Sequence, residues 1–236
     1  MMRGFLLVFK TFWSPGSAFE EIAESPVRPW AAILVLTIVG LISTGVITTI
    51  ILPAEMALLA LEQSPQGSNL TDEQKERIAE STRNSPFRFI GFVFAVVGPL
   101  LLVAVLAGMH FGIFMILGSS AKYRSFFSLT SFAMLPLLIR NVAATLMVIF
   151  IPVSAINPLE LGGIAPSAFL DPTEVSRTVF AIALSLDLVT FWVLILLIIA
   201  YRNVTPNRTS VITRTIGVLI PWLILVAGRV GLTLLF

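Results

Sequence analysis

The chain has 236 residues, of which 57% are hydrophobic and only 12% are charged, and its mean hydropathy is +0.97. Soluble domains usually carry about twice that share of charged residues, and a water-soluble fold of this size cannot bury so much apolar surface. The composition therefore argues against a soluble enzyme, a disordered tail and a nucleic-acid-binding protein, and it indicates a polytopic membrane protein. The net charge of +2 is too small to indicate an anionic partner.

Few residues of this chain can carry catalysis or bind a metal. Cysteine is absent, which excludes disulfides and thiol chemistry, and a single histidine, His110, argues against zinc sites that need two imidazoles. The sequence has no Gly-rich phosphate loop with its lysine, no Gly-x-Ser-x-Gly elbow and no His-Glu-x-x-His motif. We therefore predict that the protein is not an enzyme and has no catalytic residue, no cofactor and no metal site.

The apolar residues are concentrated in long stretches. A helix needs about 20 mostly apolar residues to cross the roughly 30 Å hydrocarbon core of a bilayer, and no stretch alternates like a barrel strand. The predicted fold is an all-α membrane protein, a five-helix transmembrane bundle with a short N-terminal interfacial helix. The predicted spans are residues 30–52, 87–117, 126–153, 178–201 and 216–236, with a polar loop at 53–86, within a membrane domain 29–236 that follows an N-terminal segment 1–28.

The distribution of lysine and arginine predicts the orientation, because cytoplasmic loops carry an excess of these residues. The N-terminal segment and the connections after the second and fourth spans hold eight of them, and the other side holds five. We therefore predict a cytoplasmic N-terminus and a C-terminus outside. The eight are Arg3, Lys10, Arg28, Lys122, Arg124, Arg202, Arg208 and Arg214, and the five are Lys75, Arg77, Arg83, Arg88 and Arg177.

Two segments outside the spans have helical patterns. Phe5, Val8, Phe9 and Phe12 share one helical face, which predicts the interfacial helix. This N-terminal segment, cytoplasmic or interfacial, is either a membrane-surface lead-in or a docking motif.

The polar loop contains the second pattern. Thr71 is a capping residue before two acids, and Glu73 and Arg77 lie four residues apart, as in an attractive helical pair. We predict a short surface helix here, which is either a solvated connector or a binding site.

Three stretches occur in the order found in a known family. The first precedes the first span, the second is a glycine-bearing turn with the helix after it, and the third lies in the fourth span. They are Trp13-Ser-Pro15 with Ala18-Phe19, Ile22, Pro26 and Pro29; Gly118-Ser-Ser-Ala-Lys-Tyr123 with Phe126 to Pro136-Leu-Leu; and Leu186-Asp187 with Phe191-Trp192-Val-Leu. In these features the chain resembles the Yip-domain family of five-span membrane proteins, relatives of the Rab-interacting factors of vesicle traffic.

The resemblance implies five spans, a cytoplasmic N-terminus and a scaffold, interaction or trafficking-related role. The eukaryotic members have a long cytosolic N-terminal region, whereas only residues 1–28 precede the first span here. We therefore expect a compact prokaryotic-type member in a cytoplasmic membrane. The stretch Ile-Ile-Ala-Tyr201-Arg202 departs from the glycine-ended fourth helix of the family.

Three charged residues lie well inside the predicted spans, namely Arg140, Asp187 and Arg229. Each costs about 2.5–3.5 kcal/mol to insert, so each requires a partner or a purpose. At 1.5 Å per residue, Arg140 and Arg229 lie roughly 20 Å from the inner ends of their spans, and Asp187 lies about 15 Å from the outer end of its own. We predict an Arg140–Asp187 ion pair, with Arg229 joining it or snorkelling outward. The pair either fixes helix register or belongs to a transport or proton-relay site, and the absence of contact is a third alternative.

His110 lies between Gly108 and Gly112, near the cytoplasmic end of the second span. The Gly-x-x-x-Gly spacing allows close approach of two helices, so we predict that this face packs against a neighbouring helix. His110 is then an interhelical hydrogen-bonding residue, with a pH sensor and a metal ligand as the alternatives.

Two functions from different classes fit this sequence. The first is a non-enzymatic membrane scaffold or interaction module, and the second is a small transporter or channel with its polar centre at Arg140 and Asp187. The expected partners are the lipid bilayer and proteins at the cytoplasmic face, a homo-oligomer is left open, and nucleic acid is not expected. A water-accessible cavity that reaches Asp187 would favour the transporter, and a dry, packed interior would favour the scaffold.

Overall fold

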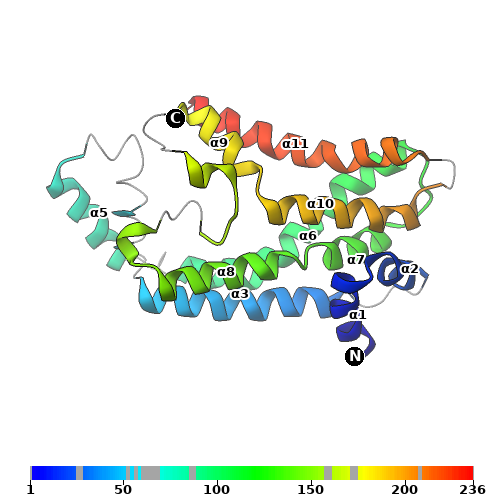
Figure 1. The fold of residues 1–236 in the computed structure, drawn as a ribbon, viewed down its shortest axis with the longest axis horizontal. Helices are drawn as coiled ribbons and strands as arrows, with labels where there is room; N and C mark the ends of the chain where they lie inside the picture. The colour runs from blue at the N-terminus through cyan, green and yellow to red at the C-terminus, as the bar shows by residue number, and fades with distance from the viewer. Residues whose placement is uncertain are drawn as a thin grey trace.

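The computed structural model describes residues 2–24, 29–51, 54–55, 58–59, 70–84, 89–156, 161–170, 175–206 and 209–235. Regular structure in these ranges is helical throughout, which confirms the predicted all-α fold. The long apolar helices lie along the long axis of the molecule (Figure 1). The two N-terminal helices lie at one end of this bundle, and α5 (Asp72–Asn84) lies at the other (Figure 1).

Four helical segments are long and apolar enough to cross a membrane, and a bent pair of helices supplies a fifth crossing if the pair counts as one span. The four are α3 (Trp30–Ile50), α6 (Ile90–Ile116), α7 with α8 (Tyr123–Ala133 and Leu137–Phe150) and α11 (Val211–Leu235). The bent pair is α9 (Arg177–Ser185) with α10 (Leu188–Tyr201). Short 3-10 turns lie in the connections, at Val153–Ala155 (η3), Pro166–Phe169 (η5) and Arg202–Val204 (η6).

Two helix boundaries differ from the predicted spans for local reasons. The third span is divided between α7 and α8, because Pro136 has no N–H with which to continue the helical ladder. The last helix begins at Val211 rather than at Ile216. Ser210 Oγ accepts a hydrogen bond from the backbone N–H of Thr213 at 3.0 Å, and this cap starts the helix earlier than the apolar run alone indicates.

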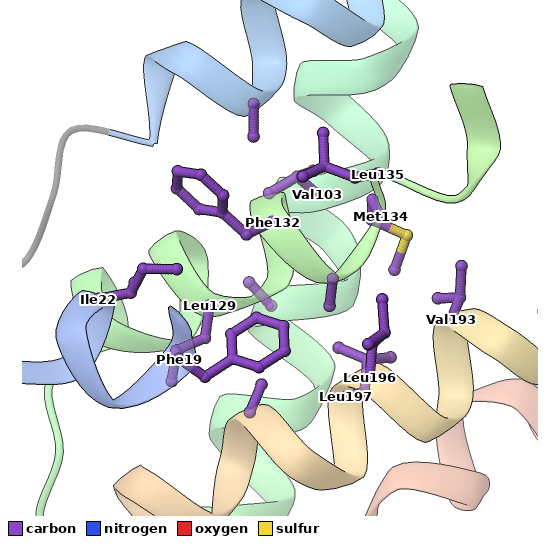
Figure 2. Packing of buried hydrophobic residues seen from close by; sticks show 14 of the residues in the cluster. Phe19, Ile22, Val103, Leu129, Phe132, Met134, Leu135, Val193, Leu196 and Leu197 are labelled. Carbon is purple, nitrogen blue, oxygen red and sulfur yellow. The ribbon is translucent and has the colours of Figure 1, made fainter. Parts of the chain in front are cut away.

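The main apolar core lies where α2 (Pro15–Glu24), α7 and α10 meet (Figure 2). Phe19 and Ile22 point from α2 into this core, and both are almost completely buried. They lie with Leu129 of α7 and Leu197 of α10, which come from distant parts of the sequence. The second N-terminal helix is therefore an integral part of the bundle.

The first helix, α1 (Met2–Trp13), is tied to α2 by one carboxylate between two cations. Glu21 accepts hydrogen bonds from Lys10 Nζ at 2.9 Å and from Arg3 Nε at 2.7 Å. The bond from Lys10, followed by that from Arg3, lowers the pKa of Glu21 below its ordinary 4.5. Glu21 therefore stays charged to a lower pH than a free glutamate, and the contact between the two helices persists with it.

Apolar residues of α1 fall on two sides of the helix. Val8 and Phe9 both belong to the predicted face, but Val8 is buried against the bundle whereas Phe9 is 67% exposed, and Trp13 is 86% exposed. A helix with one side on the protein and an apolar side turned outward suits the boundary between lipid and water.

The polar loop contains the predicted surface helix, α5. Gln74 N–H donates to Thr71 Oγ1 at 3.3 Å, and Thr71 N–H donates to Gln74 Oε1 at 2.9 Å, so the two residues form a capping box. Arg77 pairs with Glu73 one turn away at 2.8 Å. Both observations confirm the local pattern, although a pair this exposed adds little to stability.

We expect Phe19→Ala to lower the free energy of unfolding by about 3–5 kcal/mol, because it leaves a cavity at a fully buried position. Trp13→Ala is the matched control, since Trp13 is an aromatic residue on the adjacent helix that is 86% exposed. Thermal unfolding in detergent measures both variants. Equal melting temperatures for the two would contradict the docking of α2 into the core.

Candidate functional site

The fourth crossing is broken in its middle, and a charged residue lies at the break. α9 ends at Ser185, α10 begins at Leu188, and the chain bends by 50° between them. Asp187 is the N-cap of α10, and its carboxylate accepts hydrogen bonds from the backbone N–H and the hydroxyl of Thr190, both at 3.2 Å. The carboxylate also faces the positive end of the α10 dipole. The break thus gives an acid inside a span its own backbone partner.

A non-helical segment between α8 and α9 folds back to this break. The N–H of Ile164 donates to Asp187 Oδ1 at 3.0 Å, and the N–H of Leu188 donates to the carbonyl of Ile164 at 3.0 Å. These bonds pair backbone groups that an apolar membrane interior could not satisfy. Gly162 has a φ of +73°, and a Cβ there would lie 2.2 Å from the carbonyl oxygen of Arg140. Only glycine therefore lets the segment lie this close to α8.

The structure brings Arg140 of α8 next to Asp187. Arg140 Nη1 lies 4.0 Å from Asp187 Oδ2, which is an ion-pair distance but longer than a hydrogen bond. The Asp187 side chain is 3% exposed, whereas that of Arg140 is 39% exposed. The acid is thus satisfied mainly by its own helix and by Ile164. Arg140 donates no hydrogen bond to the residues that the structure describes.

Arg229 of α11 contacts the end of α9 rather than Asp187. Its Nη1 donates to Ser185 Oγ at 3.3 Å, and this hydroxyl in turn donates to the carbonyl of Ala181 at 2.8 Å. The serine thereby links α11 to the last turn of α9. Arg229 is an exposed residue that lines the same cavity as Arg140, and it forms no ion pair with Asp187.

Both arginines line one cavity of about 460 Å³ between α6, α8, α9, α10 and α11. Its hydrophilic side chains are His110, Arg140, Ser185, Thr190 and Arg229. A second cavity of about 350 Å³ lies between α3, α6 and α8, and Arg140 lines this one as well. Both volumes fall in the range of small-molecule sites. Asp187 lines neither cavity, so the acid is enclosed while the arginines face open space.

His110 is buried between α6 and α11. Its Nδ1 lies 2.7 Å from the carbonyl oxygen of Leu106, and its Nε2 lies 3.4 Å from that of Val218 in α11. The imidazole also lies beside the ring of Tyr201, with the ring centroids 5.0 Å apart. These are contacts of a residue that joins helices. No group of three potential metal ligands occurs among the residues that the structure describes.

The glycine pair of α6 does not make the close helix contact that its spacing predicted. A Cβ at Gly108 or Gly112 would meet no atom of the described chain within 4 Å, because this side of α6 faces away from the bundle. A close approach occurs instead near the start of α6, where a Cβ at Gly91 would lie 3.3 Å from the Thr44 methyl group of α3. The spacing alone did not indicate which side of the helix faces a neighbour.

Sequence reasoning missed several residues that build the site. An acid that interrupts an apolar run is an N-cap signal, so Asp187 could have predicted both the break and its bond to Thr190. Gly162 and Gly163 likewise indicate a turn, but nothing local indicates where that turn packs. Ser185 carried no signal, since serine is common within membrane helices.

The fold and the site define an integral membrane protein built from apolar helices, one of them broken around a buried acid. Residues 9–232 match the model of the Yip1 domain. The chain therefore belongs to the Yip1 family, which confirms the resemblance seen in its sequence. Searches of curated proteins and of solved structures find no match.

We expect Asp187→Asn to lower the free energy of unfolding by about 1–2 kcal/mol, because the one amide oxygen can keep the N-cap while Arg140 loses its counter-charge and the N–H of Ile164 loses its acceptor. Asp187→Ala removes the cap as well and costs about 1 kcal/mol more. Thermal unfolding in detergent measures these losses, and a double-mutant cycle with Arg140→Gln isolates the pair. Unchanged melting in both Asp187→Asn and Arg140→Gln would contradict a contribution of the pair to stability.

Proposed function

We propose that the chain is a non-enzymatic scaffold or interaction protein of a prokaryotic cytoplasmic membrane, and that it meets protein partners at one end of its bundle. The observation that supports this proposal is the gathering of three distant segments at that end. They are the N-terminal helices, the turn 118–122 and the connection 202–206. The distribution of lysine and arginine assigns all three to the cytoplasm.

Direct contacts join these segments. Ser119 Oγ donates a hydrogen bond to the carbonyl of Val204. Gly118 adopts a φ of +86°, and a Cβ there would lie 4.0 Å from the ring of Pro206. α2 packs against both α10 and η6. The segments therefore form one surface, which we name the cytoplasmic end, rather than separate loops.

The cytoplasmic end carries exposed cations. Lys122, Arg124 and Arg202 are exposed, and none of them forms an ion pair with a residue that the structure describes. Complementary charge accelerates association and selects partners. A protein with an acidic surface, approaching along the membrane, fits this end. Segment 1–28 then acts as the cytoplasmic or interfacial part of the chain, and 29–236 acts as its membrane domain.

Transport is a second candidate function, which the broken fourth crossing and the cavity beside it favour. Discontinuous helices form the binding sites of many transporters. Against this reading, Asp187 is 3% exposed and lines no cavity, so it is not accessible to a solute. Solute flux in proteoliposomes that Asp187→Asn abolishes would favour transport over the scaffold.

The proposed orientation can be tested directly by cysteine labelling. The chain contains no cysteine, so a single introduced cysteine is its only thiol that can react with a label. We expect a membrane-impermeant maleimide to label Glu76→Cys, on α5, in intact cells. Arg124→Cys should react only after permeabilisation, since it lies on the opposite side of the bilayer. The reverse labelling pattern would show that the chain is inverted.

Photo-crosslinking tests the interaction proposal. A photoreactive residue at Lys122 or at Arg202 is expected to give a discrete protein adduct in living cells. The same residue at Arg77, exposed on α5 at the other end, is the control and should give none. Glutamine at Lys122, Arg124 and Arg202 together should reduce crosslinking from a neighbouring position at the cytoplasmic end. Identical adducts from both ends, or none from either, would count against a partner surface there.

A further inference from the structure

Arg140 and Arg229 face one cavity with most of their hydrogen-bonding capacity unused. A guanidinium carries five N–H donors. Among the described residues Arg140 donates no hydrogen bond, and Arg229 donates only one, to Ser185. Asp187 does not supply the missing acceptor, because its oxygens accept from Ile164 and Thr190 and it lies outside the cavity. Most N–H donors of the two guanidiniums therefore have no hydrogen-bond acceptor among the described residues.

The charges at this cavity are also unequal. Two guanidiniums and one carboxylate leave one net positive charge, and the residues that line the cavity include no further acid. The Arg140 side chain is 39% exposed and Arg229 is also exposed, so the unpaired charge is costly where lipid instead of water covers this side of the bundle. A group with one negative charge and several oxygen acceptors removes both deficits. Carboxylates and phosphodiesters each carry one negative charge and pair with arginine through two parallel hydrogen bonds.

The cavity has a polar end and an apolar end. Arg140, Ser185, Thr190 and Arg229 lie toward the break between α9 and α10. Along α10 and α11 the walls then become apolar as far as Leu197 and Val218, except for His110, whose ring nitrogens face the carbonyl oxygens of Leu106 and Val218. Val218 lies roughly 16 Å from Arg229 along α11 at 1.5 Å per residue. A small free anion leaves this apolar length empty, whereas a hydrocarbon chain fills it.

We propose that this cavity binds an amphiphile whose head group carries one negative charge, a carboxylate or a phosphodiester, and which has an apolar chain. The head group lies between Arg140 and Arg229, and the chain extends toward His110. The cavity volume of about 460 Å³ suits such a ligand, and the surrounding bilayer supplies it. The proposal does not rest on the partner surface at the cytoplasmic end, and it requires no transport.

A fatty acid brominated in mid-chain is the first probe, because bromine quenches tryptophan and Trp222 lines the apolar part of the cavity. Titrated into the full-length protein in an uncharged detergent, it is expected to quench fluorescence saturably, and Trp222→Phe is expected to remove the saturable component. Arg140→Gln and Arg229→Gln should each weaken binding about tenfold or more, since each removes a charge-assisted contact. Arg124→Gln, at an exposed arginine of the cytoplasmic end, is the matched control and should leave the affinity unchanged.

Competition separates the head group from the chain. A non-brominated fatty acid and a single-chain phosphodiester lipid are expected to displace the probe, whereas the corresponding long-chain alcohol, acetate and inorganic phosphate are not. Equal displacement by the alcohol would overturn recognition of the head group, and equal displacement by acetate or phosphate would overturn the role of the chain.

The absence of saturable quenching, or an unchanged affinity in Arg229→Gln, would overturn the proposal altogether. Arg229→Gln is the decisive variant, because it leaves the Arg140–Asp187 pair and the cap of α10 intact. Its melting temperature shows directly whether the protein in the titration is folded.

Discussion

An acid in the middle of an apolar span must find hydrogen-bond donors within the protein, and this requirement at Asp187 determines the structure around it. An unbroken helix offers none, since each interior N–H is already bonded to the carbonyl four residues earlier. Ending one helix at Ser185 and starting another at Leu188 frees N–H groups in the first turn of α10. The carboxylate then receives the backbone N–H and hydroxyl of Thr190. The same acid that is costly in lipid thereby stabilises the break that accommodates it.

The break imposes further conditions on its neighbours. It leaves the N–H of Leu188 without a helical partner, and the carbonyl of Ile164 supplies one, so the connection after α8 must return into the bundle. Gly162 makes this return possible, because any side chain there would collide with the backbone at Arg140. The bend of 50° turns α9 onto α11, and a cavity remains beside the bend. The returning loop and the cavity therefore both accompany the one interruption that Asp187 requires.

The sequence predicted those features that depend on nearby residues or on depth in the membrane. Long apolar runs indicated the crossings, Thr71 and its neighbours indicated the cap of α5, and counting residues placed Arg140 and Asp187 at similar depths. Features that depend on packing between distant segments could not be predicted from the sequence. Segment 161–164 contacts the break through the backbone N–H and carbonyl of Ile164, and backbone atoms carry no residue-specific signal. The spacing of Gly108 and Gly112 places both glycines on one side of α6, but the packing of the whole bundle decides which side of α6 meets α3.

The two ends of the bundle differ in how tightly they are held. Near α2 the interior is filled by aromatic and branched side chains, and the ring centroids of Phe114 and Phe126 lie 5.1 and 5.2 Å from that of Tyr201. Near the break the interior is held by a few polar contacts around open volume. Two arginines, Arg140 and Arg229, lie in that second region with one acid, and nothing in the described fold requires both of them to support it. Asp187 already accepts hydrogen bonds from Thr190 and from Ile164 of the returning loop. Without Arg229, the only described acceptor to lose a donor is the Ser185 hydroxyl, which still donates to the carbonyl of Ala181. An anion bound at the cavity would give Arg229, which the described architecture does not otherwise need, a function that offsets the cost of placing its charge in lipid.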